Sequence, residues 1–257
     1  MAKKKTGKIE RASVYIMGEA PMVEEFAEVC ANHGYSVLVS WNVSPKTAPS
    51  LPPSIRKSQT IPKNSAIGIE LTNSDLAIKK KNLAKLDAAL EPERAILSSS
   101  VAVTATEQSN WIIGKHRLVG ISALPTLIEK PLVELAPTVF SPRETVDVVA
   151  NFFMSLKKEI EIVQDRVGMV LPRILCQLIN ESAFALTEEV ATPQDVDTAM
   201  KLGANYPIGP VEWADKIGLK QVYAVLEALY RDLKEERYRI SPLLSQMVQS
   251  GEYWKKN

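Results

Sequence analysis

The sequence contains few of the residues that build metal centres and disulfide frameworks. Its 257 residues include two histidines and two cysteines, Cys30 and Cys176, and neither cysteine has the spacing of a metal ligand. We expect both cysteines to be small buried apolar residues and the protein to be cytoplasmic, where thiols stay reduced. No stretch approaches the length of a membrane span, and no apolar signal segment follows the N-terminus. The sequence therefore predicts no metal site and no membrane contact.

A strong net charge is also absent. The chain has 31 Lys and Arg residues against 30 Asp and Glu residues. This balance provides no extended basic surface of the kind that binds nucleic acid. The basic N-terminal segment MAKKKTGK is interpreted as a disordered, solubilising tail. With 46% hydrophobic residues, the composition is typical of a globular protein large enough for two domains.

The first part of the chain has the pattern of a parallel sheet. Two apolar segments, SVYIMG (13–18) and SVLVSW (36–41), flank a segment with helical spacing. Pro21 suits the first position of that helix, and Gly34 suits its C-terminal end. A strand, a helix and a second strand form one βαβ unit, which predicts parallel pairing.

Further strands and helices are predicted up to residue 165. Residues 42–65 are rich in proline, serine and lysine and predict an extended surface connection. A helix over 141–157 is expected to begin with Ser141 as its N-cap. The remaining predictions are strands at 66–71, 94–100, 117–122 and 159–165 and a helix at 75–90.

After Asp165 the pattern becomes entirely helical. Thr192, Pro193 and Asp195 have the arrangement of a helix start with a capping box. The predicted helices span 167–189, 192–204 and 219–234. We therefore divide the chain into an α/β domain, residues 1–165, and an all-α domain, residues 166–257.

The most specific pattern in the chain is DVDTAMKLGANYPIGPVEWADKIGL (195–219). It resembles the C-terminal domain of the 3-hydroxyacyl-CoA dehydrogenase family, whose pattern D-x-D-x-A-M-x-x-G-x-G-x-P-x-G-P it matches except at Asn205. The resemblance continues through IELTNSDLAIKKKNLAKLD (69–87) and LVGISALPTLIEKPLVEL (118–135). It implies a Rossmann-like first domain that binds NAD and a helical second domain that forms a homodimer. Family members oxidise the 3-hydroxyl of an acyl-CoA in fatty-acid metabolism.

The expected cofactor turn departs from the G-x-G-x-x-G fingerprint of dinucleotide binding. Gly18 holds the first position, whereas Ala20 and Val23 stand at the second and third. Trp41 stands near the end of the second strand, where an acid would receive the ribose hydroxyls. Lys79 keeps a lysine that the resemblance places near the nicotinamide.

Acidic residues surround this turn. Glu19, Glu24 and Glu25 lie in the turn or in the first turn of the helix. They suit the helix dipole, but they also take the electrostatic role that a phosphate would otherwise fill. Ser74 replaces a family glutamate near the nicotinamide. NAD binding is therefore expected to be weak or lost.

The catalytic positions have changed as well. The resemblance places the family's catalytic histidine at Ser122 and the glutamate that orients it at Glu134. A serine hydroxyl is no base near neutral pH unless another group accepts its proton. Val101 and Pro172 replace a serine and an asparagine on the substrate side. His116 is interpreted as an exposed loop residue and not as a displaced base.

Three functional interpretations remain open at this point. The leading one is a family member that has lost catalysis but keeps a dimeric scaffold, with a groove for an acyl-CoA or a partner. The second is an active NAD-dependent oxidoreductase on 3-hydroxyacyl-CoA or a related hydroxy acid, with Glu134 as its base. The third is a binding or structural subunit that works only through partners.

Overall fold

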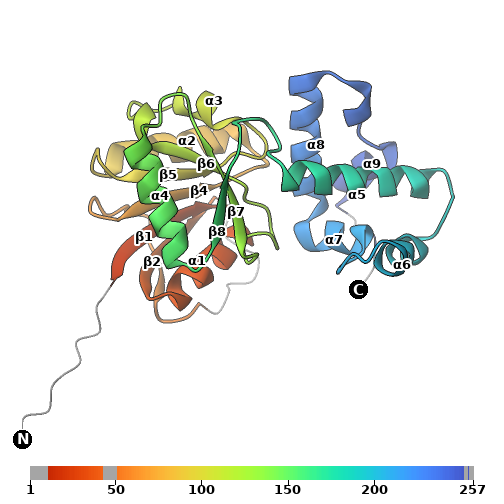
Figure 1. Ribbon diagram of the computed structural model, residues 1–257, viewed down its shortest axis with the longest axis horizontal. Helices are drawn as coiled ribbons and strands as arrows, with labels where there is room; N and C mark the ends of the chain where they lie inside the picture. Colours follow the sequence, from red (N-terminus) through yellow and green to blue (C-terminus); the bar gives the residue numbers. More distant parts are fainter. Residues whose placement is uncertain (1–10, 43–50, 252–253, 255–257) are drawn as a thin grey trace, which may run out of the picture.

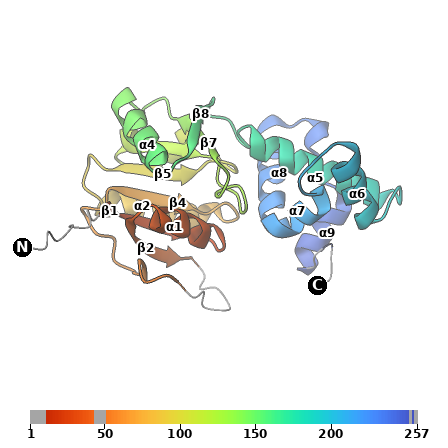
Figure 2. The ribbon, with the colours of Figure 1, turned by 60° about the horizontal axis from the view of Figure 1, so that its bottom comes forward.

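The computed structural model describes residues 11–42, 51–251 and 254. It has two parts, an α/β part built on one sheet and a helical part beside it (Figure 1). A view turned by 60° shows the same separation, with the helical part next to one end of the strands (Figure 2). The predicted combination of a Rossmann-like domain with a helical domain is confirmed.

An eight-stranded sheet forms the centre of the first part, in the order β3-β2-β1-β4-β5-β6-β7-β8. All neighbouring strands pair in parallel except β6 and β7, which are antiparallel. The strands are β1 (Arg11–Gly18), β2 (Tyr35–Trp41), β3 (Ile55–Lys57), β4 (Ile67–Leu71), β5 (Ala95–Ser99), β6 (Leu118–Ile121), β7 (Leu132–Pro137) and β8 (Glu159–Ile162).

The order of the strands reverses between β1 and β4. The chain passes from β1 outward to β2 and β3, and it then returns to place β4 on the other side of β1. In open parallel sheets, ligands bind in the crevice outside the carboxyl ends of the strands at such a reversal. A ligand site is therefore expected at the carboxyl ends of β1 and β4.

Helices cover both faces of the sheet. Phe26 of α1 and Phe153 of α4 lie in one apolar cluster with strand residues, and their rings meet edge to face. Leu83 and Leu86 of α2 lie in a separate cluster on the other face, together with Ala105 of α3. These helices are α1 (Met22–Asn32), α2 (Leu76–Ala89), α3 (Ala105–Ser109) and α4 (Arg143–Ser155).

Three local predictions differ from the structure. Ser141 is not a helix cap, because its hydroxyl donates a 2.8 Å hydrogen bond to the backbone oxygen of Leu118 and α4 follows Pro142. Pro21 occupies the N-cap and not the first helical position. The connection 42–65 contains a short strand, β3, which was missed because three residues show no period; residues 43–50 of that connection lie outside the described chain.

The second part consists of helices around their own apolar cluster. Val101 and Leu124 of the first part belong to this cluster too, so the two parts share an apolar contact. The capping box of Thr192 and Asp195 is present as predicted. The helices are α5 (Leu171–Thr187), α6 (Pro193–Gly203), α7 (Pro210–Ile217), α8 (Leu219–Leu233) and α9 (Pro242–Ser250). None of the helices in the described ranges combines the length and apolar character needed to cross a membrane.

Candidate functional site

The carboxylate of Glu19 lies beside the carboxyl ends of β1 and β4, where the strand order reverses. Its Oε1 accepts hydrogen bonds from the hydroxyl of Ser74 at 2.6 Å and from the Ser74 backbone N–H at 3.2 Å. Its Oε2 accepts a hydrogen bond from Nε2 of Gln221 at 2.5 Å. Glu19 follows β1, Ser74 follows β4 and Gln221 lies on α8. One carboxylate therefore connects both strand ends to the helical part.

Gly18 gives the turn the shape that places Glu19 there. Its φ of +147° is rarely adopted by residues with a side chain, and an added Cβ would lie 2.5 Å from the backbone carbonyl carbon of Leu71. The backbone N–H of Glu19 donates to the oxygen of Leu71 at 3.1 Å. The turn after β1 is thus pressed against the end of β4, and the next side chain projects over the crevice.

The two other glutamates of this region are also bonded within the protein. Glu24 accepts a 2.8 Å hydrogen bond from the indole N–H of Trp41, and its burial raises its pKa. Both oxygens of Glu25 accept from the backbone N–H of Thr126, at 3.2 and 3.0 Å. Burial, together with the nearby charge of Glu129, raises the pKa of Glu25 to about 7. Trp41 therefore faces an acid of α1.

The other predicted residues of the turn have ordinary packing. Val23 is fully buried in the apolar cluster that includes Phe26, so its branched side chain lies in the core and not at the surface of the turn. Ala20 is exposed. Neither residue contributes a polar group to the crevice.

Lys79 is held inside a buried polar network. Its Nζ lies 2.5 Å from a carboxylate oxygen of Glu70, and both side chains are buried. Nζ also donates to the backbone oxygen of Thr72 at 2.8 Å, and Asn82 donates to the second oxygen of Glu70 at 3.0 Å. Burial lowers the pKa of Lys79, which the charge of Glu70 opposes. The ammonium group is therefore directed at the protein interior.

The structure brings Ser122 and Glu134 together, but through the backbone of Glu134 and not through its carboxylate. The N–H of Ser122 donates to the oxygen of Glu134, and the N–H of Glu134 donates to the hydroxyl oxygen of Ser122, both at 3.1 Å. The carboxylate of Glu134 instead accepts from the N–H groups of Val170 at 2.8 Å and Leu171 at 2.7 Å. Glu134 thus caps the start of α5, where a negative charge also suits the helix dipole.

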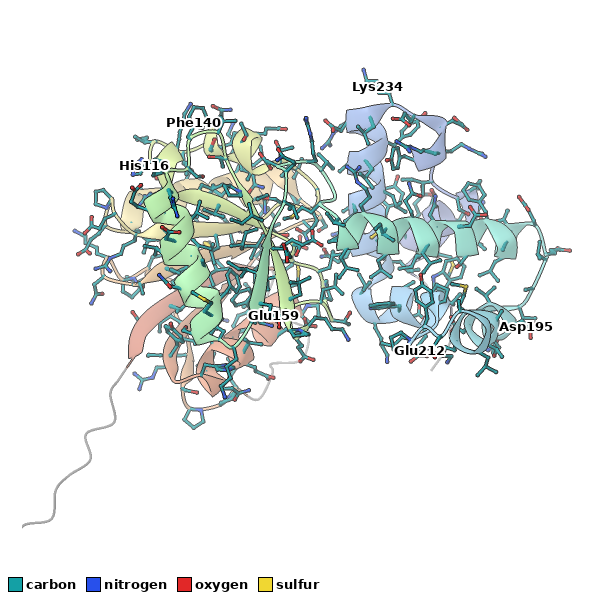
Figure 3. The ribbon with its side chains drawn as sticks, in the orientation of Figure 1. His116, Phe140, Glu159, Asp195, Glu212 and Lys234 are labelled. Atoms are coloured by element: carbon teal, nitrogen blue, oxygen red, sulfur yellow. The ribbon has the colours of Figure 1, made fainter. Side chains whose placement is uncertain are left out.

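No imidazole lies beside Ser122. The chain has only two histidines. His33 ends α1, where its Nδ1 lies 2.8 Å from the backbone oxygen of Val29. His116 precedes β6 whereas Ser122 follows it, so they lie at opposite ends of that strand. His116 is exposed on the side of the first domain away from the helical part (Figure 3).

The predicted substrate-side residues are buried in apolar surroundings. Val101 packs in the second apolar cluster with Leu124 and Leu127. Pro172 is buried in the first turn of α5. Neither position offers a hydrogen-bond donor from its side chain.

Sequence reasoning missed two polar residues of the crevice, Asn73 and Gln221. Nδ2 of Asn73 donates to Oε1 of Gln221 and to the backbone oxygen of Ala123, both at 3.0 Å. Oδ1 of Asn73 is buried without a partner. The sequence contained one indication of this contact, because Gln221 is a polar residue on the otherwise apolar buried face of α8.

These residues do not fit the pyrophosphate of NAD. An anion at this place needs free N–H donors and close approach to the backbone. Here the carboxylate of Glu19 already takes the donors of Ser74 and Gln221, and its charge repels a phosphate. The unpartnered Oδ1 of Asn73 is an acceptor and not a donor. Within the described ranges, no three His, Cys, Asp or Glu side chains gather to hold a metal ion.

Known proteins resemble the chain over most of its length. Residues 168–257 match the family model of the 3-hydroxyacyl-CoA dehydrogenase C-terminal domain. A probable 3-hydroxybutyryl-CoA dehydrogenase of Bacillus subtilis is 32% identical over 203 residues, 78% of this chain and 70% of that protein. The 3-hydroxybutyryl-CoA dehydrogenase of Bradyrhizobium diazoefficiens is 32% identical over 174 residues; the match covers 68% of this chain but 59% of that protein.

Solved structures have the same two-domain fold. The (S)-3-hydroxybutyryl-CoA dehydrogenase of Ralstonia eutropha superposes with a TM-score of 0.78 at 26% identity, covering 95% of this chain and 99% of that one. M. tuberculosis FadB2 gives a TM-score of 0.83 at 20% identity, covering 95% and 98%, which shows the fold alone.

Proposed function

Because the chain belongs to the 3-hydroxyacyl-CoA dehydrogenase family, we propose that it keeps the two-domain scaffold of that family without NAD-dependent hydride transfer. The observation that carries this proposal is the position of Glu19. Its carboxylate lies at the reversal of the strand order, beside the turn that would receive the pyrophosphate, and it is bonded to Ser74 on one side and to Gln221 on the other. A dinucleotide would have to break these bonds and displace a negative charge.

The catalytic positions support the same proposal. Oxidation of a 3-hydroxyl requires a base that takes the hydroxyl proton as hydride leaves the carbon. Ser122 has no imidazole beside it, and the carboxylate of Glu134 is engaged at the start of α5. Among the described residues, the Glu134 carboxylate is bonded away from Ser122, and the Glu19 carboxylate is bonded beside the cofactor turn.

The retained scaffold suggests a role in binding. We infer that a second copy packs on the helical domain, as the family resemblance implies. At the start of α5, Val170, Leu171 and Ile174 expose 48%, 38% and 59% of their surfaces to solvent. Apolar side chains gathered on one surface often mark an interface. We also propose that an acyl-CoA or a protein partner binds between the two domains.

A direct assay tests the proposed loss of catalysis. The purified full-length chain is mixed with NADH and acetoacetyl-CoA, with an active 3-hydroxybutyryl-CoA dehydrogenase as the positive control. Because loss of a general base alone lowers the rate by about 10²–10⁴-fold, we expect turnover at least ~10²-fold below the control. A rate within about tenfold of the control would favour an active enzyme with an altered site.

A further inference from the structure

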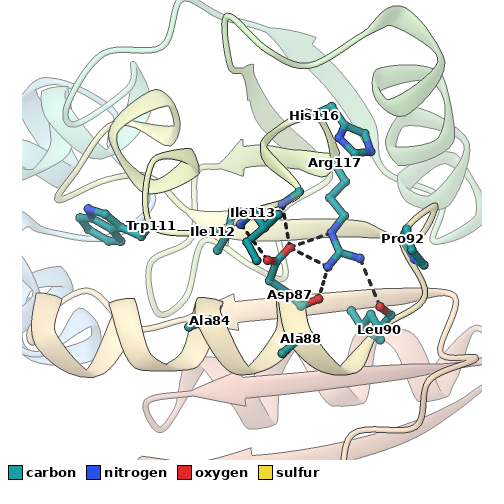
Figure 4. Close-up of a pocket in the computed structure, with 11 residues that line it drawn as sticks. Ala84, Asp87, Ala88, Leu90, Pro92, Trp111, Ile112, Ile113, His116 and Arg117 are labelled. Carbon is teal, nitrogen blue, oxygen red and sulfur yellow. Dashed lines mark hydrogen bonds and ion pairs between the residues drawn. The ribbon is translucent and has the colours of Figure 1, made fainter.

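A second hollow lies away from the crevice, between α2 and the loop formed by residues 111–117 (Figure 4). Its volume is about 430 Å³, which is in the range of small-molecule sites. The lining is mostly apolar. It includes Ala84 and Ala88 from α2 and Trp111 and Ile113 from the loop.

Small residues create this hollow. Ala84 and Ala88 are one helical turn apart on the exposed side of α2, so two adjacent positions carry only a methyl group. Gly114 has no side chain where a Cβ would lie 2.6 Å from Nε of Arg117 and 2.9 Å from Oδ1 of Asp87. The loop can therefore approach α2 closely at one end while the space above the alanines stays open.

A buried ion pair fixes the floor. Asp87 and Arg117 lie 2.7 Å apart, with 8% and 4% of their side chains exposed. Asp87 also accepts from the N–H of Ile113 at 2.8 Å and of Gly114 at 3.2 Å, and Arg117 donates to the backbone oxygen of Glu91 at 2.8 Å. These bonds satisfy both charged groups and hold the loop in place. The floor therefore offers a ligand no unpaired charge.

Ile113 forms one wall of the hollow, and its apolar side chain is exposed to water. Ile113 is 96% exposed while its backbone is bonded to Asp87. Because the backbone is already fixed, a ligand that covers the Ile113 side chain removes water from an apolar group without having to order the loop. Such a surface favours an apolar partner.

The mouth carries positive charge. Lys81 and Lys85 lie outside the lining but are exposed, and helical spacing places each on the side of α2 that carries Ala84 and Ala88. His116 is exposed at the other end of the hollow. Asp87 is the only acid of α2, and Arg117 neutralises it. Of the two acids beside the lining residue Pro92, Glu91 pairs with Arg94 at 2.9 Å and Glu93 is exposed, so a single acid stands against the two lysines. The mouth is therefore complementary to an anion.

We propose that this hollow binds a small amphiphilic anion, a carboxylate with an aromatic or short aliphatic body. The body lies over Ala84 and Ala88 against Trp111 and Ile113, and the carboxylate faces His116, which lines the hollow. The site is independent of the crevice and of the loss of catalysis proposed above.

Calorimetric titration of the full chain with octanoate, octan-1-ol and octylammonium tests the proposal. We expect saturable octanoate binding, with octylammonium at least ~10-fold weaker because the mouth repels it. Ala88→Leu places a larger side chain in the hollow and should weaken octanoate binding at least ~10-fold. Ala77→Leu, on an exposed position of the same helix outside the lining, should leave it within about twofold.

Leucine is a good helix former at both exposed positions, so both variants should fold, which circular dichroism checks. His116→Ala is a second variant at an exposed site, and it should weaken octanoate but not octanol. Three results would overturn the proposal: no saturable octanoate binding at about 5 mM, equal binding of octylammonium, or unchanged octanoate binding in Ala88→Leu. The last result would place the ligand elsewhere, such as the crevice.

Discussion

Gln221 and Glu19 are 202 residues apart in the sequence, and a 2.5 Å hydrogen bond joins their side chains. The same carboxylate accepts from Ser74. One side chain thus stands at the reversal of the strand order and also ties the sheet to α8. In the function proposed above, this contact is what keeps a dinucleotide from the turn after β1.

The Glu19–Gln221 bond should make a measurable contribution to stability. Hydrogen bonds to charged groups contribute about 1.5–3 kcal/mol, and the bond is partly buried. In a double-mutant cycle, Glu19→Ala and Gln221→Ala should show a coupling of about 1 kcal/mol in the free energy of unfolding. Urea denaturation followed by circular dichroism measures it. Additive effects, within about 0.3 kcal/mol, would mean that the contact does not connect the domains.

Glu134 is predicted to act as a helix cap. Glu134→Gln should lower the free energy of unfolding by about 1–2 kcal/mol, because the two N–H groups at the start of α5 lose a charged acceptor. The control Glu161→Gln, at an exposed position of β8, should stay within about 0.5 kcal/mol of the wild type. If Glu134 were a base instead, the substitution would remove turnover and leave stability unchanged.

Glu25 should make stability depend on pH. Burial raises its pKa from 4.5 to about 7, so the folded protein binds more protons than the unfolded chain between these values. The free energy of unfolding should therefore fall as pH rises from about 4.5 to about 7. Glu25→Gln removes this dependence and should be more stable than the wild type at pH ~8 by about 1 kcal/mol, after allowance for solvent screening.

The comparison requires a matched control. Glu144→Gln changes an exposed carboxylate at the start of α4 and should leave the slope between pH ~4.5 and ~7 intact. Thermal melts across this pH range provide the measurement. Equal slopes in Glu25→Gln and the wild type would show that Glu25 does not titrate near neutrality.

The dimer proposed on the helical domain has a simple test. Ile174→Glu places a charge in the exposed apolar surface at the start of α5 and should convert a dimer to a monomer. Glu188→Gln, at an exposed residue beyond the other end of the same helix, is the control. Light scattering during size-exclusion chromatography gives the mass of each. A wild-type monomer at all concentrations would contradict the proposal.

Local patterns predicted most of the fold. The apolar segments 13–18 and 36–41 and the helix between them gave β1, β2 and α1, because burial on both faces of a parallel sheet produces short apolar runs. Thr192 and Asp195 marked the start of α6, since a capping box depends only on neighbouring residues. Ser141 has the same local signal, but its hydroxyl bonds Leu118 of another strand.

The candidate site was predictable only in part. The acids around the turn indicated that a carboxylate could take the place of a phosphate. Which acid, and with which partners, depends on Gln221 in a helix of the other domain. Similarly, the family resemblance implied that Ser122 and Glu134 lie close together, whereas the bonds of Glu134 to Val170 and Leu171 depend on where α5 meets the sheet. Contacts between distant segments leave no periodic signal in a single sequence.

Calorimetric titration of NADH into the purified chain tests the central claim most directly, because it asks whether the crevice admits the dinucleotide at all. With Glu19 bonded to Ser74 and Gln221, we predict no saturable heat up to about 1 mM NADH. Saturable binding at micromolar concentrations, lost on competition with NAD, would contradict the account.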